Sequence, residues 1–115
     1  MKIDWTHVRI FVKPGATDMR KQINGLSIIA EEECPENIFD GHLYLFCNKG
    51  HNRLKILYWD RNGFCLWLKR LEQDRFPWPK NREERIEITE EKLDMLLRGI
   101  DFFNAHKKLI FSAVS

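Results

Sequence analysis

The sequence contains no long apolar run, and none approaches the roughly 18 residues that a membrane-spanning helix requires. Its N-terminus, MKIDWTHVRI, lacks the apolar core of a secretory signal. Both absences argue against a membrane protein and against a secreted one. We therefore expect a cytoplasmic protein with no membrane partner.

Cysteine is also scarce, and the three cysteines form no CxxC pair. An odd number of thiols at such spacing argues against a disulfide framework and against a zinc knuckle. We expect Cys34, Cys47 and Cys65 to be reduced and partly buried. Internal repeats and low-complexity segments are absent as well. Residues 1–115 are therefore interpreted as a single domain, and the 43% hydrophobic and 31% charged residues are typical of a globular chain.

Charge is unevenly distributed, although the net value is only +2. Residues 49–85 carry ten Lys or Arg and five Asp or Glu, whereas the segments on both sides of them are slightly acidic. Such a basic middle third is typical of a surface that faces a polyanion. It is equally typical of a solvated sheet face on which Lys and Arg stems cover apolar surface. The sequence leaves both interpretations open.

Runs of β-branched and aromatic residues predict the strands. The expected strands are Val8–Lys13, His42–Cys47, Arg53–Trp59, Phe64–Arg70 and a short edge strand over Arg85–Ile88. Gly50 is expected to supply a positive φ in the first turn of the central region. Asn62 and Gly63 are expected to do so in the second, because both residues tolerate left-handed backbone.

Two principal helices are predicted from apolar spacing and end signals. The first should begin after Thr17 as N-cap, with Asp18 in its first turn, and run to Glu33. The second should begin after Thr89 and end near Gly99. Their expected buried positions are Met19, Ile23, Leu26, Ile29 and Ala30 in the first, and Leu93, Leu96, Leu97 and Ile100 in the second. The predicted fold is α+β, with an antiparallel meander of three or more strands packed with these helices.

Side chains alternate along a strand, which assigns the meander residues to faces. We expect one apolar face made of Leu54, Ile56, Tyr58, Phe64, Leu66 and Leu68. The opposite face should combine Trp59 and Trp67 with Lys55 and Lys69. The second face is either a binding surface or a surface covered by the C-terminal segment of residues 102–115, which is too apolar for a free tail.

Three kinds of chemical site were considered and set aside. Asp18, Asp60 and Glu72 are candidates for two-metal phosphoryl chemistry, but turn and helix-end roles explain the first two. His42, Cys47, His51 and Cys65 match no zinc spacing. Cys65 has no neighbouring base that would activate it as a nucleophile. We therefore expect no catalytic residue, no metal, no cofactor and no small-molecule substrate.

Binding is the function class that the residues favour. Lys55, Trp59, Arg61, Trp67, Lys69, Arg70 and Arg75 are the candidate DNA-binding residues, with cations for phosphates and aromatic rings for stacking on bases. Phe76 and Trp78, in the segment RFPWP, are the candidate partner-binding residues, since a proline-bracketed aromatic loses little entropy on binding. A homo-oligomeric structural module is a further alternative.

Several segments together resemble a known family. They are TDMRK at Thr17–Lys21, then Gly25-Leu26, GHLYLF, KILYWDRNGFCLWLKRLE, RFPWP and LLRGID. The chain resembles the small accessory proteins of insertion sequence 66 mobile elements from about Val8 to Asp101. The resemblance implies a non-enzymatic protein that supports DNA transposition, with the transposase of the same element, DNA or both as partners. It supplies no active-site residue. The chain departs from the family at Gln22-Ile23-Asn24 and at the less basic turn Cys47-Asn48-Lys49.

Overall fold

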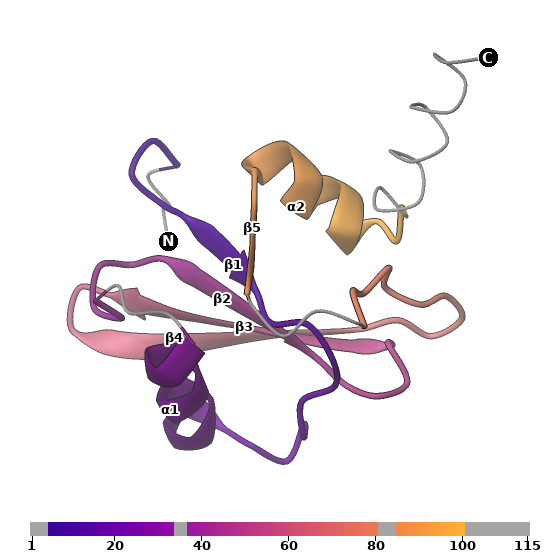
Figure 1. Cartoon of the computed structure of the whole chain (residues 1–115), viewed down its shortest axis with the longest axis horizontal. Coiled ribbons are helices and arrows are strands. Elements are labelled where there is room, and N and C mark those ends of the chain that lie inside the picture. The colour runs from indigo at the N-terminus through magenta and orange to yellow at the C-terminus, as the bar shows by residue number, and fades with distance from the viewer. Residues whose placement is uncertain (1–4, 34–36, 81–84, 101–115) are drawn as a thin grey trace.

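The computed structural model describes residues 5–33, 37–80 and 85–100, which form five strands and two helices (Figure 1). The elements are β1 (Ile10–Val12), α1 (Ile23–Glu33), β2 (Leu43–Cys47), β3 (Arg53–Asp60), β4 (Gly63–Arg70), β5 (Ile86–Ile88) and α2 (Glu90–Leu97). All five strands belong to one sheet in the order β4-β3-β2-β1-β5. Cys34 and the predicted tail of residues 102–115 lie outside the described residues.

The predicted meander is confirmed, because β2, β3 and β4 pair antiparallel in sequence order. The sheet as a whole is mixed, however, and the expectation of a purely antiparallel sheet is wrong. Strand β1 pairs parallel with β2, with Ile10 opposite Leu43, and antiparallel with β5. Parallel neighbours need a crossover rather than a hairpin, and α1 supplies it. The fold is therefore α+β around a mixed five-stranded sheet.

The predicted division of the meander into faces is wrong. Residues directly opposite each other share a face, and the register places Ile56 opposite Trp67 and Trp59 opposite Phe64. Asp60 faces Gly63, and only residues 61 and 62 lie between them in the chain. Each even-numbered residue of β3 therefore faces an odd-numbered residue of β4. A change of one residue in register moves every side chain of a strand to the other face.

Each face of the sheet carries one helix, so the core has two parts. Figure 1 shows α1 on one side of the sheet and α2 on the other. The α2 side buries Ile10, Val12, Leu43, Leu45, Cys47, Leu54, Ile56, Phe76, Trp78, Ile88, Leu93 and Leu96. The α1 side buries Phe11, Leu26, Ala30, Ile38, Tyr44, Phe46 and Leu57. No helix in the described part of the chain is long and apolar enough to cross a membrane.

The first helix begins later than predicted, at Ile23 instead of directly after Thr17. Thr17 is held by the sheet, since its N–H donates to Cys47 O at 2.8 Å. Asp18 Oδ1 accepts from Arg20 N at 2.9 Å, which closes a local turn in place of a helix cap. The predicted apolar stripe is confirmed: Leu26 and Ala30 are buried, and Met19, Ile23 and Ile29 pack against them.

The second helix is confirmed at both ends. Thr89 Oγ1 accepts from Lys92 N at 3.2 Å, as an N-cap should. Gly99 has φ +78°, and Ile100 N donates to Met95 O at 2.9 Å, which is the arrangement of a glycine helix end. The expected burial of Ile100 is wrong, because this side chain lies beyond the helix and is exposed.

Positive φ angles fall on residues other than the predicted ones. In the β2–β3 turn His51 has φ 59°, and in the β3–β4 turn Arg61 has φ 53°. Gly50, Asn62 and Gly63 are not among the positive-φ residues. A two-residue hairpin with the positive φ at its first position is of the II′ kind, which usually places glycine there. Arg61 therefore occupies a strained position.

Candidate functional site

Three segments meet at one end of the sheet, where β2 ends, β3 begins and β4 ends. They are residues 13–21, 48–53 and 70–80, and we call this region the cationic end. Backbone hydrogen bonds join them, from Gly15 N to Pro79 O at 2.9 Å, Leu71 N to Asn52 O at 2.8 Å and Phe76 N to His51 O at 2.6 Å. Thr17 N also donates to the O atom of Cys47, the last residue of β2, at 2.8 Å. Figure 1 shows the three segments at the end of the sheet opposite the β3–β4 turn.

The turn at the centre of this end is organised by asparagine. Asn48 Oδ1 accepts from the N–H groups of Asn52 and Arg53, both at 3.0 Å. Asn48 Nδ2 donates to Asn52 Oδ1 at 2.7 Å. Short amide side chains commonly replace missing backbone partners in turns in this way. The result is a rigid turn that fixes where Lys49 and Arg53 project.

The cationic end concentrates the charge of the chain. Its three segments contain eight Lys or Arg and three Asp or Glu, a net +5, whereas the whole chain is only +2. Five of the cations are exposed and form no ion pair with any described residue. These five are Lys21, Lys49, Arg53, Arg75 and Lys80. Unpaired like charges repel each other, and an anion bound among them would remove that repulsion.

A shallow groove of about 540 Å³ opens on the α1 side of this end. Its lining is Met19, Gln22, Arg53, Lys55, Leu68, Arg70 and Glu72. Arg53 and Arg70 stand directly opposite each other in the β3–β4 register. Like charges at such a position destabilise a sheet. Arg70 is compensated by Glu72 at 3.0 Å, and Arg53 has no carboxylate partner among the described residues.

Lys55 lines the groove but is not available to a ligand. Its side chain is only 5% exposed, and Nζ donates to Met19 O and to Lys21 O, both at 2.9 Å. The prediction of Lys55 as an exposed phosphate contact is wrong. Its ammonium instead ties the segment before α1 to the sheet, since a buried charge must find hydrogen-bond acceptors.

Trp59 and Trp67, expected on one face, lie on opposite faces. Trp59 is half-buried on the α1 side, with ring centroids 4.9 Å from Phe39 and 5.0 Å from Phe64. Trp67 is on the α2 side and 41% exposed. Lys69 lies on the α2 side as well, where Nζ donates to Leu97 O at 2.9 Å. The structure therefore contains no continuous surface that joins both tryptophans with Lys55 and Lys69.

The remaining candidate cations are divided between the two ends of the hairpin. Arg70 and Arg75 belong to the cationic end. Arg61 lies in the opposite turn, about 26 Å from Arg53 at the usual rise of a strand. Sequence reasoning missed Lys21, Lys49, Arg53 and Lys80. The pairing of Arg53 with Arg70 could have been found by counting outward from the two-residue turn.

Phe76 and Trp78 are buried, so the expectation of exposed partner-binding anchors is wrong. They are 2% and 6% exposed and belong to the core on the α2 side. Trp78 Nε1 donates to Lys13 O at 3.0 Å and to Gly15 O at 3.1 Å. A buried indole needs a partner for its N–H. The proline-bracketed segment thus fastens the cationic end to the core.

Ionisable groups near this end have pKa values that follow their surroundings. Burial lowers the pKa of His51, and the nearby charges of Lys80 and Arg75 lower it further. Hydrogen bonds from Arg20 lower the pKa of Asp18 to about 2. Burial raises the pKa of the Cys47 thiol to about 12, which keeps it protonated and unreactive.

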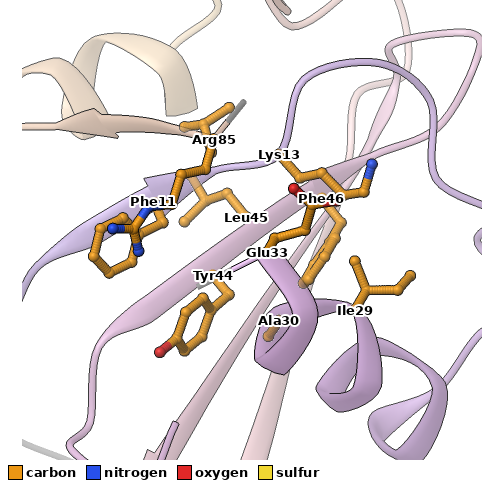
Figure 2. A pocket seen from close by; sticks show the side chains of 10 residues that line it. Phe11, Lys13, Ile29, Ala30, Glu33, Tyr44, Leu45, Phe46 and Arg85 are labelled. Atoms are coloured by element: carbon orange, nitrogen blue, oxygen red, sulfur yellow. The ribbon is translucent and has the colours of Figure 1, made fainter. Parts of the chain in front are cut away.

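The structure offers no metal-binding cluster among residues 5–33, 37–80 and 85–100. His42, one of the residues considered for a metal site, accepts at Nδ1 from Arg9 N at 3.0 Å. A second cavity lies between α1 and strands β1 and β2, where Arg85 covers the Phe11 ring at 4.3 Å (Figure 2). Its volume is about 10 Å³, which is too small for anything larger than a water molecule.

Comparison with known proteins adds family information. A family described as "IS66 Orf2 like protein" matches residues 8–107. Two uncharacterized proteins of Sinorhizobium fredii (strain NBRC 101917 / NGR234) are similar. The protein y4hO is 36% identical over 96 residues, which cover 84% of each chain. The protein y4jC is 28% identical over 101 residues, which cover 88% of this chain and 86% of its own. No solved structure matches.

Proposed function

This chain belongs to the family of IS66 Orf2-like proteins, and we propose that it is a non-enzymatic accessory protein that supports transposition by binding the phosphate backbone of the element's DNA. The contact is assigned to the cationic end. The family match supports the setting in a mobile element. The gathering of five exposed, unpaired Lys and Arg side chains in one region supports the DNA contact.

The kind of DNA recognition follows from the residues. Lysine and arginine on a rigid turn bind phosphates, and phosphate contacts position a protein without reading sequence. The two tryptophans that could stack on bases do not line the groove. We therefore expect binding to duplexes of any sequence, with base recognition left to another component of the element.

The test is the salt dependence of binding to a short labelled duplex, followed by fluorescence anisotropy. Each phosphate contact contributes about 0.9 to the slope of log K against log salt, so five contacts give a slope of roughly −4 to −5. The double variant Arg53→Gln/Arg75→Gln should weaken binding and reduce the slope by about 2. Arg61→Gln serves as the matched control. It makes the same substitution at the β3–β4 turn, at the far end of the hairpin, and removes one positive charge. Its affinity should stay within about twofold of wild type, since it loses no phosphate contact.

Two results would contradict the proposal. One is the absence of binding even at about 20 mM salt, where phosphate contacts are strongest. The other is an equal loss of affinity in Arg61→Gln, because this would mean that overall charge matters and the cationic end does not.

Contact with the element's transposase is a second candidate, supported by the outer side of α2. Glu90 and Glu91 are exposed and form no ion pair with a described residue, and they suit a basic partner surface. Co-purification of the two proteins should be weakened by Glu91→Lys and unaffected by the cationic-end variants. Co-purification that Glu91→Lys leaves unchanged would exclude this surface.

A further inference from the structure

Strand β4 forms one edge of the sheet, and β5 forms the other. The two edges differ in length, since β4 has 8 residues and β5 has 3. No strand within the described residues pairs with the outer side of β4. Natural proteins usually shorten, charge or cover such edges, because a long free edge offers a row of hydrogen-bonding groups to another strand.

Two large apolar side chains are exposed next to each other on this edge. Trp67 is 41% exposed and Leu68 is 56% exposed. Consecutive residues of a strand point to opposite faces, so one lies on the α2 side and the other on the α1 side. A partner docked on either face would cover only one of them. A strand added alongside β4 would cover both.

We propose that the occupant of this edge is a second copy of the chain, whose β4 pairs antiparallel with the first about a two-fold axis at Leu66. In this register Leu66 faces its own equivalent. Phe64 faces Leu68 of the second copy, and Cys65 faces Trp67 of the second copy. The exposed Leu68 therefore faces the half-buried Phe64, and the exposed Trp67 faces the half-buried Cys65, in each case on strand β4 of the other copy. A C2 interface requires such self-complementarity.

The hydrogen-bonding pattern agrees with this register. Asp60 and Gly63 flank a two-residue turn, which makes them a hydrogen-bonded pair. Bonded and non-bonded pairs alternate along an antiparallel ladder, so the backbone groups of Phe64, Leu66 and Leu68 face away from β3. These are the three residues that meet their counterparts when the axis passes through Leu66.

The charges near the end of β4 favour a two-fold axis at Leu66 over one at Trp67. Residues 63–68 carry no charge, and Lys69 and Arg70 follow at one end only. With the axis at Leu66, the two cations face Gly63 and Asn62 of the second copy. With the axis at Trp67, Arg70 would face Phe64. A parallel arrangement would place like charges side by side, which destabilises a sheet.

An aromatic cluster on the α1 side provides an apolar contact surface for Leu68 of the second copy. Phe64 contacts Phe39 at 5.8 Å between ring centroids and Trp59 at 5.0 Å. Leu68 of the second copy would lie opposite Phe64 and beside this cluster, and the contact occurs twice because of the two-fold axis. Both cationic ends would face the same side of a ten-stranded sheet, about 26 Å apart along the strands.

The first test is the oligomeric state of the purified full-length protein, without DNA, measured by sedimentation equilibrium. Wild type should be a dimer at about 100 µM, since dimer population depends on protomer concentration. Leu68→Lys places a charge on the edge and should raise the dimer dissociation constant by at least about tenfold. Ile28→Lys is the matched control, because Ile28 is 57% exposed and belongs to α1, so it offers no backbone group to a strand paired with β4. The unfolding temperature of each variant shows that it remains folded.

The second test checks the register by mild oxidation. Trp67→Cys should form a covalent dimer with Cys65 of the second copy, since facing residues of a non-bonded pair lie about 4.5 Å apart at Cα. Leu68→Cys faces Phe64 and should not cross-link. A monomeric wild type would overturn the proposal, including one whose β4 becomes protected only when transposase is added. Dimers that Leu68→Lys leaves intact, or that cross-link through Leu68→Cys instead, would overturn it as well.

Discussion

Replacing Lys55 by methionine should destabilise the fold and leave DNA binding by the folded protein unchanged. Lys55 is 5% exposed and donates from Nζ to the carbonyl oxygens of Met19 and Lys21, both at 2.9 Å. Methionine keeps the apolar stem of the side chain and removes the ammonium. The variant therefore separates a structural role from the phosphate contact that a basic sequence first suggests.

The magnitude follows from two opposing terms. A hydrogen bond to a charged group contributes about 1.5 to 3 kcal/mol, and Lys55 forms two of them. Burial of the ammonium already costs the native state several kcal/mol, and the variant avoids that cost. We expect a net loss of about 2 to 3 kcal/mol in the free energy of unfolding. For a chain of 115 residues, 1 kcal/mol corresponds to about 4 °C, so the unfolding temperature should fall by roughly 8 to 12 °C.

Thermal and urea unfolding, followed by circular dichroism, measure this loss. Duplex affinity is then measured at low temperature, where the variant is folded, and should stay within about twofold of wild type because no phosphate contact is lost. Arg53→Gln is the complementary control, with weaker binding and a stability change below about 0.5 kcal/mol. An unchanged unfolding temperature in Lys55→Met would refute the tether. A folded Lys55→Met variant that no longer binds DNA would refute the assignment of the contact to the exposed cations.

Three further predictions concern single residues. Trp78→Phe removes the indole donor and should lower the free energy of unfolding by about 1 to 2 kcal/mol in urea titrations; an unchanged value would contradict the role of its hydrogen bonds. Arg61→Gly relieves a positive φ of 53° and should raise the unfolding temperature by about 4 °C, whereas a decrease would show that the turn is unstrained. His51 has a lowered pKa, and bound phosphates should raise it, so duplex affinity should increase as pH falls from about 7.5 to 5.5. His51→Asn, which tolerates the same φ, should abolish that pH dependence, and an unchanged pH profile would exclude His51.

Local signals were sufficient to predict much of the fold. The meander was predictable because its strands are consecutive and joined by short turns. Helix α2 was predictable because Thr89 and Gly99 mark its ends with residues that have specific capping chemistry. Such features depend on neighbours in sequence, and their physics is visible in the sequence itself.

Features that depend on distant partners were not predictable in the same way. Thr17 looks like a helix cap, but a hydrogen bond to Cys47 holds it at the sheet. Trp78 looks like an exposed anchor between prolines, but the carbonyl oxygens of Lys13 and Gly15 receive its N–H. The candidate site was only partly predicted, because strand register decides which side chains share a surface. Arg53 and Lys55 both line the groove, and only their burial shows that Arg53 is available to a ligand and Lys55 is not.

The position of β1 in the sheet has a consequence for the order of folding. Strands β2, β3 and β4 pair within residues 43–70, so they can form soon after this segment is synthesised. Strand β1 comes first in the chain but lies between β2 and β5, and its pairing of Ile10 with Ile88 joins residues 78 positions apart. Contacts of such separation form late, because loop closure must precede them. The first strand made is therefore expected to be among the last to be enclosed, and β1 keeps an open edge until residue 88 has emerged.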